Sequence, residues 1–299
     1  MVCKTILSRF NSYPLDQKIH QQNTPMPLIK SKFYRFADNQ IRYLESGSLK
    51  KPPLVLLHAW PATADMYRPM MENLSSSFHV LAPDFPGFGL SRSSGESSYS
   101  SYTKFVSNFL TTQNLSQVYL CGSSMGAAIA LNLTHKYPKK VKKMIIHAPP
   151  INLAVYHQRL YPLLVRLSKH SRLTTPLINI LKGRPCRVYF YLRDRKYHLS
   201  FSLVDQIYST AKLSSPDAIM SLLAEFVTQD ITDLAKSISV PTRLLIGQDD
   251  HRILQSDAQK ICYLNKNFSL LSIPEVNHRF SVCAPDRFAQ AVSSFFIPS

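Results

Sequence analysis

Short apolar runs that alternate with helical patterns constrain the fold of this chain more than any other feature. Each run is the length of a strand and lies between polar or turn residues, which is typical of strands buried on both faces. The runs lie at 54–58, 78–84, 118–122, 143–149, 242–247 and 268–274. Helical patterns lie at 64–74, 102–113, 124–137, 256–264 and 285–296. This alternation predicts an α/β fold with a mostly parallel central sheet, right-handed crossovers and helices on both faces.

The alternation breaks once, between about residues 150 and 230. Helical patterns at 151–170 and 215–227 begin and end this segment, and its prolines limit the length of each helix. An all-helical insertion predicts a cap over the carboxyl edge of the sheet, where open α/β sheets bind ligands. The predicted organisation is an N-terminal arm (1–30), an α/β core (31–150 and 231–299) and a helical cap (151–230).

The region before the core is polar and contains several prolines. It has no apolar run of about 7–15 residues, so we do not expect a secretory signal. Its start is basic and without acidic residues before Asp16, which leaves a transit peptide as an alternative, but we interpret residues 1–30 as an extended arm. The following segment, 32–46, predicts two strands around a turn at Asp38 and Asn39. Without an export signal, the expected location is the cytoplasm.

Composition and charge exclude several classes of protein. Hydrophobic residues make up 45% of the 299 residues and charged residues 18%, so the chain can bury a core and is not disordered. No apolar run reaches the ~18–20 residues of a transmembrane helix. The net charge of +17 favours attraction to an anionic partner, such as an acidic membrane surface or an acidic substrate, or is a general feature of a basic soluble enzyme. Nucleic acid is not expected as a partner, because no zinc-ligand spacing or RNA-binding aromatic motif is present.

The cysteine pattern favours a reducing compartment. The five cysteines are odd in number, widely spaced and without a C-x-x-C pair. They are Cys3, Cys121, Cys186, Cys262 and Cys283. This pattern fits neither a disulfide framework nor a zinc site. We expect no metal and no organic cofactor, because nothing in the sequence suggests one.

The sequence GSSMG at 122–126 carries the clearest chemical signal. It matches G-x-S-x-G with Ser124 at the centre, between a predicted strand and a predicted helix. That context is required of a nucleophile elbow, in which a serine hydroxyl stands on a sharp strand-to-helix turn. The alternative is a serine that merely caps a helix. We predict that Ser124 is a catalytic nucleophile.

A serine nucleophile needs a base that is itself oriented by an acid. Where the serine stands on a strand–turn–helix elbow of an α/β sheet, the order along the chain is Ser, acid, His. His278 fits the base because it follows the strand at 268–274, whereas His251 directly abuts the acidic pair and reads as an exposed loop residue. Either Asp249 or Asp250 could orient the base, since both follow the strand at 242–247. Adjacent residues of an extended loop point in opposite directions, so only one is expected to do so. We favour Asp250, the last position of a G-x-x-D pattern.

Attack of a serine on a carbonyl carbon forms a tetrahedral intermediate, and its oxyanion needs two backbone N–H groups aimed at it. The amide of Met125, directly after the nucleophile, is expected to supply one. The loop HAWP at 58–61 is expected to supply the other, for which we choose the amide of Trp60. The Trp60 ring is expected to line the substrate pocket, although it could also be a plain core residue. His58 is expected to brace this loop through a hydrogen bond.

These motifs together resemble the α/β-hydrolase fold family, in particular its capped serine hydrolases. The matching stretches follow the family's order at 58–61, 84–91, 122–126, 241–250 and 277–278. The resemblance implies a triad of Ser124, Asp250 and His278 and an oxyanion hole built from the amides of Trp60 and Met125. Two positions depart from the family pattern: His58 is followed by Ala59 rather than glycine, and Asn277 rather than glycine precedes His278. Neither change removes a reactive group.

The expected chemistry is hydrolysis of a carboxylic ester through an acyl-enzyme intermediate. The nucleophile is a serine rather than an aspartate, which argues against relatives that open epoxides or displace halide. Basic residues interleaved with aromatic and aliphatic ones between 159 and 196 favour a lipid-like or medium-chain ester, or are a solvated cap face. A C–C bond hydrolase or an acyltransferase on the same triad is the first alternative. A non-catalytic ligand-binding protein that keeps the fold is the second.

Overall fold

The computed structural model describes residues 28–93, 95–151, 201–228 and 231–297, with isolated positions at 175–176, 179, 188–189 and 191–192. Apart from its last three residues, the predicted N-terminal arm lies outside the described residues. So does most of the predicted cap between 152 and 200. Within the described part of the chain, no helix is both long and apolar enough to cross a membrane.

An eight-stranded sheet forms the centre of the described part of the chain, in the order β1-β2-β4-β3-β5-β6-β7-β8. Its strands are β1 (Lys30–Phe36), β2 (Asn39–Ser46), β3 (Pro53–Leu57), β4 (His79–Pro83), β5 (Val118–Ser123), β6 (Val141–His147), β7 (Thr242–Gly247) and β8 (Phe268–Ile273). β2 is antiparallel to both β1 and β4, and all other neighbours are parallel. The prediction of a mostly parallel sheet is therefore confirmed.

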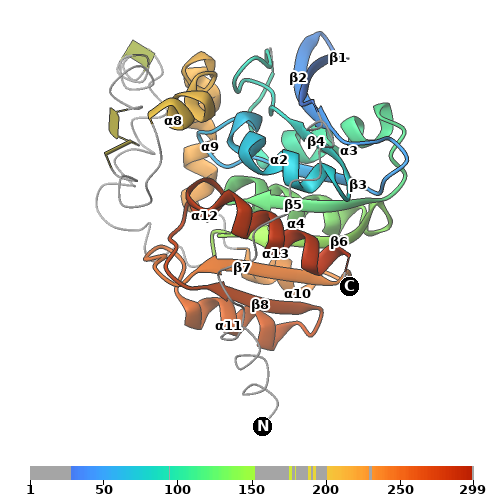
Figure 1. Ribbon diagram of the computed structural model, residues 1–299, viewed down its shortest axis with the longest axis vertical. Coiled ribbons are helices and arrows are strands. Elements are labelled where there is room, and N and C mark those ends of the chain that lie inside the picture. The colour runs from blue at the N-terminus through green and yellow to red at the C-terminus, as the bar shows by residue number, and fades with distance from the viewer. Residues whose placement is uncertain are drawn as a thin grey trace, which may run out of the picture.

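Helices cover both faces of this sheet, as predicted (Figure 1). One face carries α3 (Tyr99–Thr112), α4 (Met125–Lys136), α10 (Thr232–Lys236) and α11 (Gln255–Leu264). The other carries α2 (Arg68–Ser75), α12 (Phe280–Cys283) and α13 (Pro285–Phe296), which lie in front of the sheet in the figure. Two short 3-10 helices, η1 (Ala64–Tyr67) and η2 (Pro138–Lys140), precede α2 and β6.

Apolar residues bind these two layers to the sheet because successive strand residues point to opposite faces. In β3, Val55 and Leu57 pack into the cluster under α3 and α4, while Leu54 and Leu56 pack into the cluster under α2 and α13. All four side chains are completely buried. A strand buried on both faces has no polar side to show in its sequence, which explains the continuous apolar runs.

The element boundaries differ from the sequence prediction at two places. The hairpin turn lies at Ala37 and Asp38, one residue earlier than predicted, and Ala37 takes a positive φ of 50°. The helix predicted at 64–74 is divided into η1 and α2, because Pro69 lies in the first turn of α2 and cannot donate a backbone hydrogen bond.

The described part of the predicted cap is helical. It contains α8 (Phe201–Tyr208), the 3-10 helix η5 (Ala211–Leu213) and α9 (Pro216–Thr228), between β6 and α10. Figure 1 shows α8 and α9 grouped beyond one end of the sheet. Their hydrogen bonds, described below, join them to loops that follow β3 and β4. These helices therefore stand at the carboxyl edge, where the predicted site residues also lie.

Candidate active site

Ser124 stands on the sharp turn between β5 and α4. Its backbone takes φ 51° and ψ −110°, a conformation that non-glycine residues rarely adopt. Its side chain makes no capping hydrogen bond to α4, unlike an ordinary N-cap serine. Two glycines allow the turn: a Cβ on Gly122 would lie 2.2 Å from the carbonyl oxygen of Gly126, and one on Gly126 would lie 2.1 Å from that of Leu57. The geometry is that of a nucleophile elbow.

The two backbone N–H groups predicted for an oxyanion hole, those of Met125 and Trp60, make no hydrogen bond to a described residue. Met125 is the first residue of α4, where a backbone N–H has no partner within the helix. Neither this amide nor the amide of Trp60 donates a hydrogen bond to another described residue. The start of α4 lies against the end of β3, as the contact of Gly126 with Leu57 shows. The loop that begins at His58 therefore starts close to the first turn of α4.

His278 and Asp250 form a hydrogen-bonded pair. The distance from His278 Nδ1 to Asp250 Oδ2 is 2.8 Å. The other oxygen, Asp250 Oδ1, accepts backbone N–H groups from Arg252 at 2.9 Å and Ile253 at 3.3 Å. The Asp250 side chain is fully buried, while 17% of the His278 side chain is exposed. The acid is therefore fixed on both oxygens and the imidazole keeps access to the surface.

Neighbouring groups favour the ionised form of Asp250. Burial alone would raise the pKa of this carboxyl, but the hydrogen bond and charge of His278 and the Arg252 amide hold it below its usual value. The adjacent Asp249 uses its backbone N–H on the carbonyl oxygen of Val276 at 3.0 Å. The structure thus brings Asp250 to His278, and it leaves His251 exposed on the loop.

His58 braces the loop after β3. Its Nε2 accepts the backbone N–H of Phe85 at 3.0 Å, so the ring proton is on Nδ1, which donates to the carbonyl oxygen of Ala59 at 3.0 Å. Burial lowers the pKa of His58 to about 4, which keeps the ring neutral. A neutral ring with both nitrogens engaged is not placed to move protons. It ties the loop of Trp60 to the start of the loop after β4.

The Trp60 side chain joins the same loop to α9, in the predicted cap. Its indole N–H donates to the carbonyl oxygen of Ile219, in the first turn of α9, at 2.9 Å. The ring is half-buried and packs against the core cluster under α3 and α4. Two further bonds join the cap to the glycine-containing loop after β4: Gly89 N–H to Ser214 Oγ at 3.0 Å, and Ser215 N–H to the carbonyl oxygen of Gly87 at 2.7 Å.

A buried ionic cluster, not predicted from the sequence, lies beneath these loops. Arg42 of β2 binds both oxygens of Asp65 at 2.7 Å and one oxygen of Asp84 at 3.2 Å. Arg68 and the cap residue Thr210 also donate to Asp65, at 2.6 and 2.5 Å. Burial raises the pKa of Asp84 to about 6, against the opposing charge of Arg42. For Asp65 burial acts the same way, but the bonds and charge of Arg42 outweigh it and lower the pKa to about 2.

His147, at the end of β6, connects the two parts of the site. Its carbonyl oxygen accepts the backbone N–H of Ser124 at 2.8 Å. Burial lowers the pKa of its imidazole to about 3, and the charge of nearby His278 contributes in the same direction. The His147 ring also packs against Phe280, two residues after His278, with ring centroids 6.0 Å apart, so the Ser124 turn and the segment that follows His278 both contact this one buried histidine. Sequence analysis did not single out this residue; its only signal was a polar residue at the carboxyl end of a buried strand.

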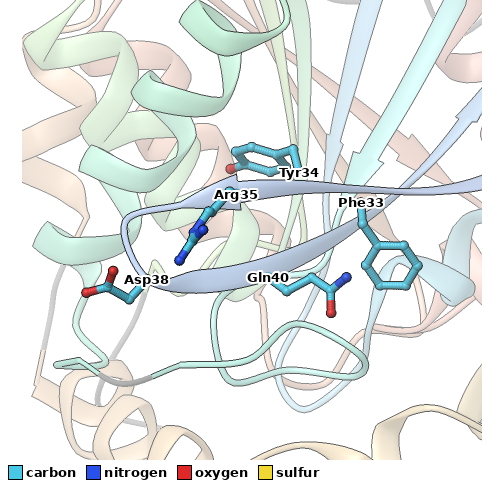
Figure 2. A pocket seen from close by; sticks show the side chains of 5 residues that line it. All are labelled: Phe33, Tyr34, Arg35, Asp38 and Gln40. Atoms are coloured by element: carbon cyan, nitrogen blue, oxygen red, sulfur yellow. The ribbon is translucent and has the colours of Figure 1, made fainter.

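A surface hollow of about 440 Å³ lies elsewhere, on the hairpin of β1 and β2. Figure 2 shows the side chains that line it. They are Phe33, Tyr34, Arg35, Asp38 and Gln40. This hairpin forms one edge of the sheet, while β7 and β8, which precede Asp250 and His278, form the other. The hollow contains none of the predicted site residues.

No group of three or more His, Cys, Asp or Glu side chains that could hold a metal ion occurs within the described ranges. The predicted site offers instead a hydroxyl, an imidazole, a carboxylate and backbone N–H groups. These are the groups that nucleophilic catalysis of acyl transfer uses.

The family follows from this fold and this site. A model of the α/β-hydrolase fold family matches residues 52–278, and the chain belongs to that family. The resemblance inferred from the sequence motifs is confirmed. Membership fixes the general class, a hydrolase-type fold, but the reactions of its members vary.

Individual relatives show this variety. The chain is 24% identical to Lipase 1 of Psychrobacter immobilis over 287 residues, which cover 93% of this chain and 88% of the lipase. It is 32% identical to a haloalkane dehalogenase of Mycolicibacterium paratuberculosis over 111 residues, 36% of this chain and 37% of that protein. Among solved structures, a thermophilic esterase of Thermogutta terrifontis matches with a TM-score of 0.72 and 18% identity, covering 90% of this chain and 97% of the esterase.

Proposed function

We propose that this protein is a serine hydrolase that cleaves a carboxylic ester through an acyl-enzyme intermediate. Ser124 is the nucleophile, His278 the general base and Asp250 the group that orients it. The observation that carries the proposal is the 2.8 Å bond between Asp250 and His278, together with a strained Ser124 turn whose side chain caps no helix. A positioned acid and base beside a serine held in this conformation are the requirements for activating its hydroxyl.

The first half of the reaction acylates the serine. His278 Nε2 takes the proton of Ser124 Oγ while Oγ bonds to the ester carbonyl carbon, and the carbonyl π electrons move onto oxygen. The amides of Trp60 and Met125 donate to this oxyanion. When the oxyanion collapses, the bond to the alkoxide breaks and His278 returns the proton to the leaving alcohol.

The second half repeats these steps with water. His278 takes a proton from water, the hydroxide oxygen bonds to the acyl carbon, and the acid leaves as the proton returns to Ser124. Before each attack, Asp250 keeps the ring proton of His278 on Nδ1, so Nε2 is free to act as the base. The charge of Asp250, favoured by its hydrogen bonds, also stabilises the imidazolium that forms in each half.

The nature of the nucleophile favours acyl chemistry over halide displacement. Displacing halide in this fold needs a carboxylate nucleophile, whereas the elbow of this chain carries a serine hydroxyl. The similarity to the haloalkane dehalogenase covers only 36% of the chain, while the similarity to Lipase 1 extends over 93%. This longer match, and the basic and apolar residues between 159 and 196, support a lipid-like or medium-chain ester. Those residues lie mostly outside the described ranges.

The location and partners we propose are those expected from the sequence. The partner is a small-molecule ester, and the basic residues between 159 and 196 are proposed to contact anionic membrane. The proposed location is the cytoplasm, on the cysteine pattern of the sequence alone.

A panel of p-nitrophenyl esters of increasing acyl length, with and without the Ser124→Ala substitution, tests the proposal. We expect wild-type turnover on part of the panel and a loss of about 10³-fold or more in kcat for Ser124→Ala. Ser256→Ala, at an exposed serine of α11, is the matched control and keeps wild-type turnover. Near wild-type activity of Ser124→Ala would exclude Ser124 as the nucleophile. Cleavage of dienone acids but of no ester would favour the C–C hydrolase alternative, and inactivity on both would favour a binding protein.

A further inference from the structure

A chain of buried polar groups lies directly behind Ser124, and the proposed reaction does not use it. The Tyr67 hydroxyl lies 2.8 Å from the carbonyl oxygen of Leu57 and 2.9 Å from Ser123 Oγ. His147 Nδ1 lies 3.1 Å from the same Ser123 Oγ. Tyr67, Ser123 and His147 are each at most 2% exposed. These hydrogen-bonded groups thus link the end of β3 to the end of β5 and then to the end of β6.

The donor and acceptor of each of these hydrogen bonds follow from the Leu57 carbonyl oxygen, at which the series begins. A carbonyl oxygen can only accept, so the single hydroxyl proton of Tyr67 is donated to Leu57. The Ser123 hydroxyl must then donate its own proton to Tyr67 Oη. Ser123 has no proton left for the imidazole, so His147 Nδ1 carries a proton and donates it to Ser123 Oγ. His147 is neutral, which leaves Nε2 as an unprotonated acceptor.

The far side of the His147 ring makes no hydrogen bond. Nε2 is buried and has no partner among the described residues. The rings of Phe280 and Phe288 pack against the imidazole edge to face, with centroids 6.0 and 5.2 Å away. A buried acceptor without a donor is unfavourable, and an apolar side chain would avoid this. What an imidazole provides here, and an apolar side chain would not, is the Nδ1–H group on Ser123.

His147 holds the nucleophile turn twice. Its backbone carbonyl accepts the N–H of Ser124, and its side chain holds the hydroxyl of the preceding residue, Ser123. Through Ser123 and Tyr67, the second contact continues to the carbonyl of Leu57, the residue before the loop of His58 and Trp60. The strand that ends in the nucleophile and the strand that leads to the proposed oxyanion loop are therefore joined by one directed hydrogen-bond chain.

We propose that His147 is a positioning residue for the reaction, which acts through its Nδ1–H group by fixing Ser123 and Ser124 relative to the oxyanion loop. The inference rests on the proposed serine-hydrolase function. A nucleophile displaced by about 1 Å from its oxyanion donors can lose about 100-fold in rate, while substrate binding, made elsewhere, changes little. The signature of this role is a loss of kcat with KM nearly unchanged.

Three substitutions at His147 separate this role from simple packing. In His147→Asn the side-chain amide can place an N–H near the position of Nδ1. In His147→Gln the amide reaches the position of Nε2 instead, and His147→Leu has no donor. We expect the asparagine variant to retain most of the wild-type kcat on the best ester of the panel. We expect the glutamine and leucine variants to lose about 10-fold or more, with KM within about threefold of wild type in all three.

The controls distinguish this inference from the proposed function. His135→Leu, at an exposed histidine of α4, should leave kcat unchanged, and the melting temperature of each variant shows whether it folds. If the leucine variant does not fold, Tyr67→Phe is the substitute, since it removes the acceptor of the Ser123 proton; we expect a loss of about 10-fold in kcat. Equal kcat in the wild type and all folded variants would overturn the inference while ester hydrolysis stands. An inactive wild type would instead refute the proposed function.

The proton position can be measured without any variant. Long-range proton–nitrogen NMR spectra of the wild-type protein at pH 7 should show His147 with Nδ1 protonated and Nε2 unprotonated. This measurement does not depend on catalysis. A ring protonated at Nε2 would contradict the direction of the hydrogen-bond chain and would overturn the proposed role of the Nδ1–H group.

Discussion

Two buried neutral histidines predict that the fold weakens in mild acid. His58 and His147 are both almost completely buried, next to Asp65 and to the pair of Asp250 and His278, respectively. Burial lowers the pKa of His58 from 6.5 to about 4 and that of His147 to about 3. The unfolded chain therefore binds a proton at each histidine well before the folded protein does. Their stabilising contribution is present above about pH 6.5 and is lost as the pH falls.

The expected magnitude follows from these values. Between pH 7 and pH 5 each histidine lowers the free energy of unfolding by about 2 kcal/mol. Asp84 acts in the opposite direction, because its pKa is raised from 3.8 to about 6 and the folded protein binds this proton first. Protonation of Asp84 raises the free energy of unfolding by about 1 kcal/mol over the same pH range. The net loss is about 2–3 kcal/mol, or a fall of roughly 4–10 °C in melting temperature.

Denaturant unfolding at a series of pH values, followed by circular dichroism, measures this loss. His147→Asn should reduce the loss between pH 7 and pH 5 by about 2 kcal/mol, because the titrating ring is gone. The matched control is His135→Asn, the same change at an exposed histidine, which should follow the wild type. A wild-type stability that is flat or rising between pH 7 and pH 5 would refute the reasoning, as would an undiminished loss in His147→Asn.

Two further predictions concern the acid and the cap. Asp250→Asn should lower kcat by about 10⁴-fold, because the imidazole loses the carboxylate that fixes its tautomer, and Asp249→Asn should lower it far less; the reverse order in steady-state assays would exchange their roles. The protein should sediment with vesicles of anionic lipid better than with neutral ones, and less so at high salt. Changing Arg193, Arg195 and Lys196, outside the described ranges, to Glu should weaken this binding without affecting turnover of a soluble ester. Equal binding to both vesicle types would leave the charge of +17 as a general solubility feature.

The layered core could be predicted from the sequence because its signals are local. A strand buried on both faces is apolar along its length, and β3, with the sequence PLVLL, shows this directly. The Ser124 turn was predictable for the same reason, since both glycines that permit it lie within two residues of the serine. Local signals also misplaced one boundary: Ala37, which carries no turn signal of its own, takes the positive φ of the hairpin.

The contacts that support the site could not be predicted, because they join residues far apart in the chain. Arg42 and Asp65 come from β2 and η1, and nothing in either segment indicates that they form a buried pair. The bond of Trp60 to Ile219 spans 159 positions. His147 shows in the sequence only as a polar residue at the end of a buried strand, and its role depends on which strands lie side by side. Such pairings are set by the topology of the sheet rather than by local pattern.

Covalent labelling of Ser124 tests the central claim most directly. The wild-type protein is treated with a fluorophosphonate probe, which forms a stable adduct only with an activated serine, and the modified peptide is identified by mass spectrometry. We predict one adduct per chain, on Ser124, no adduct in Ser124→Ala, and much slower labelling in His278→Ala. Absence of labelling in the folded wild-type protein, or an adduct on another serine that persists in Ser124→Ala, would contradict the account.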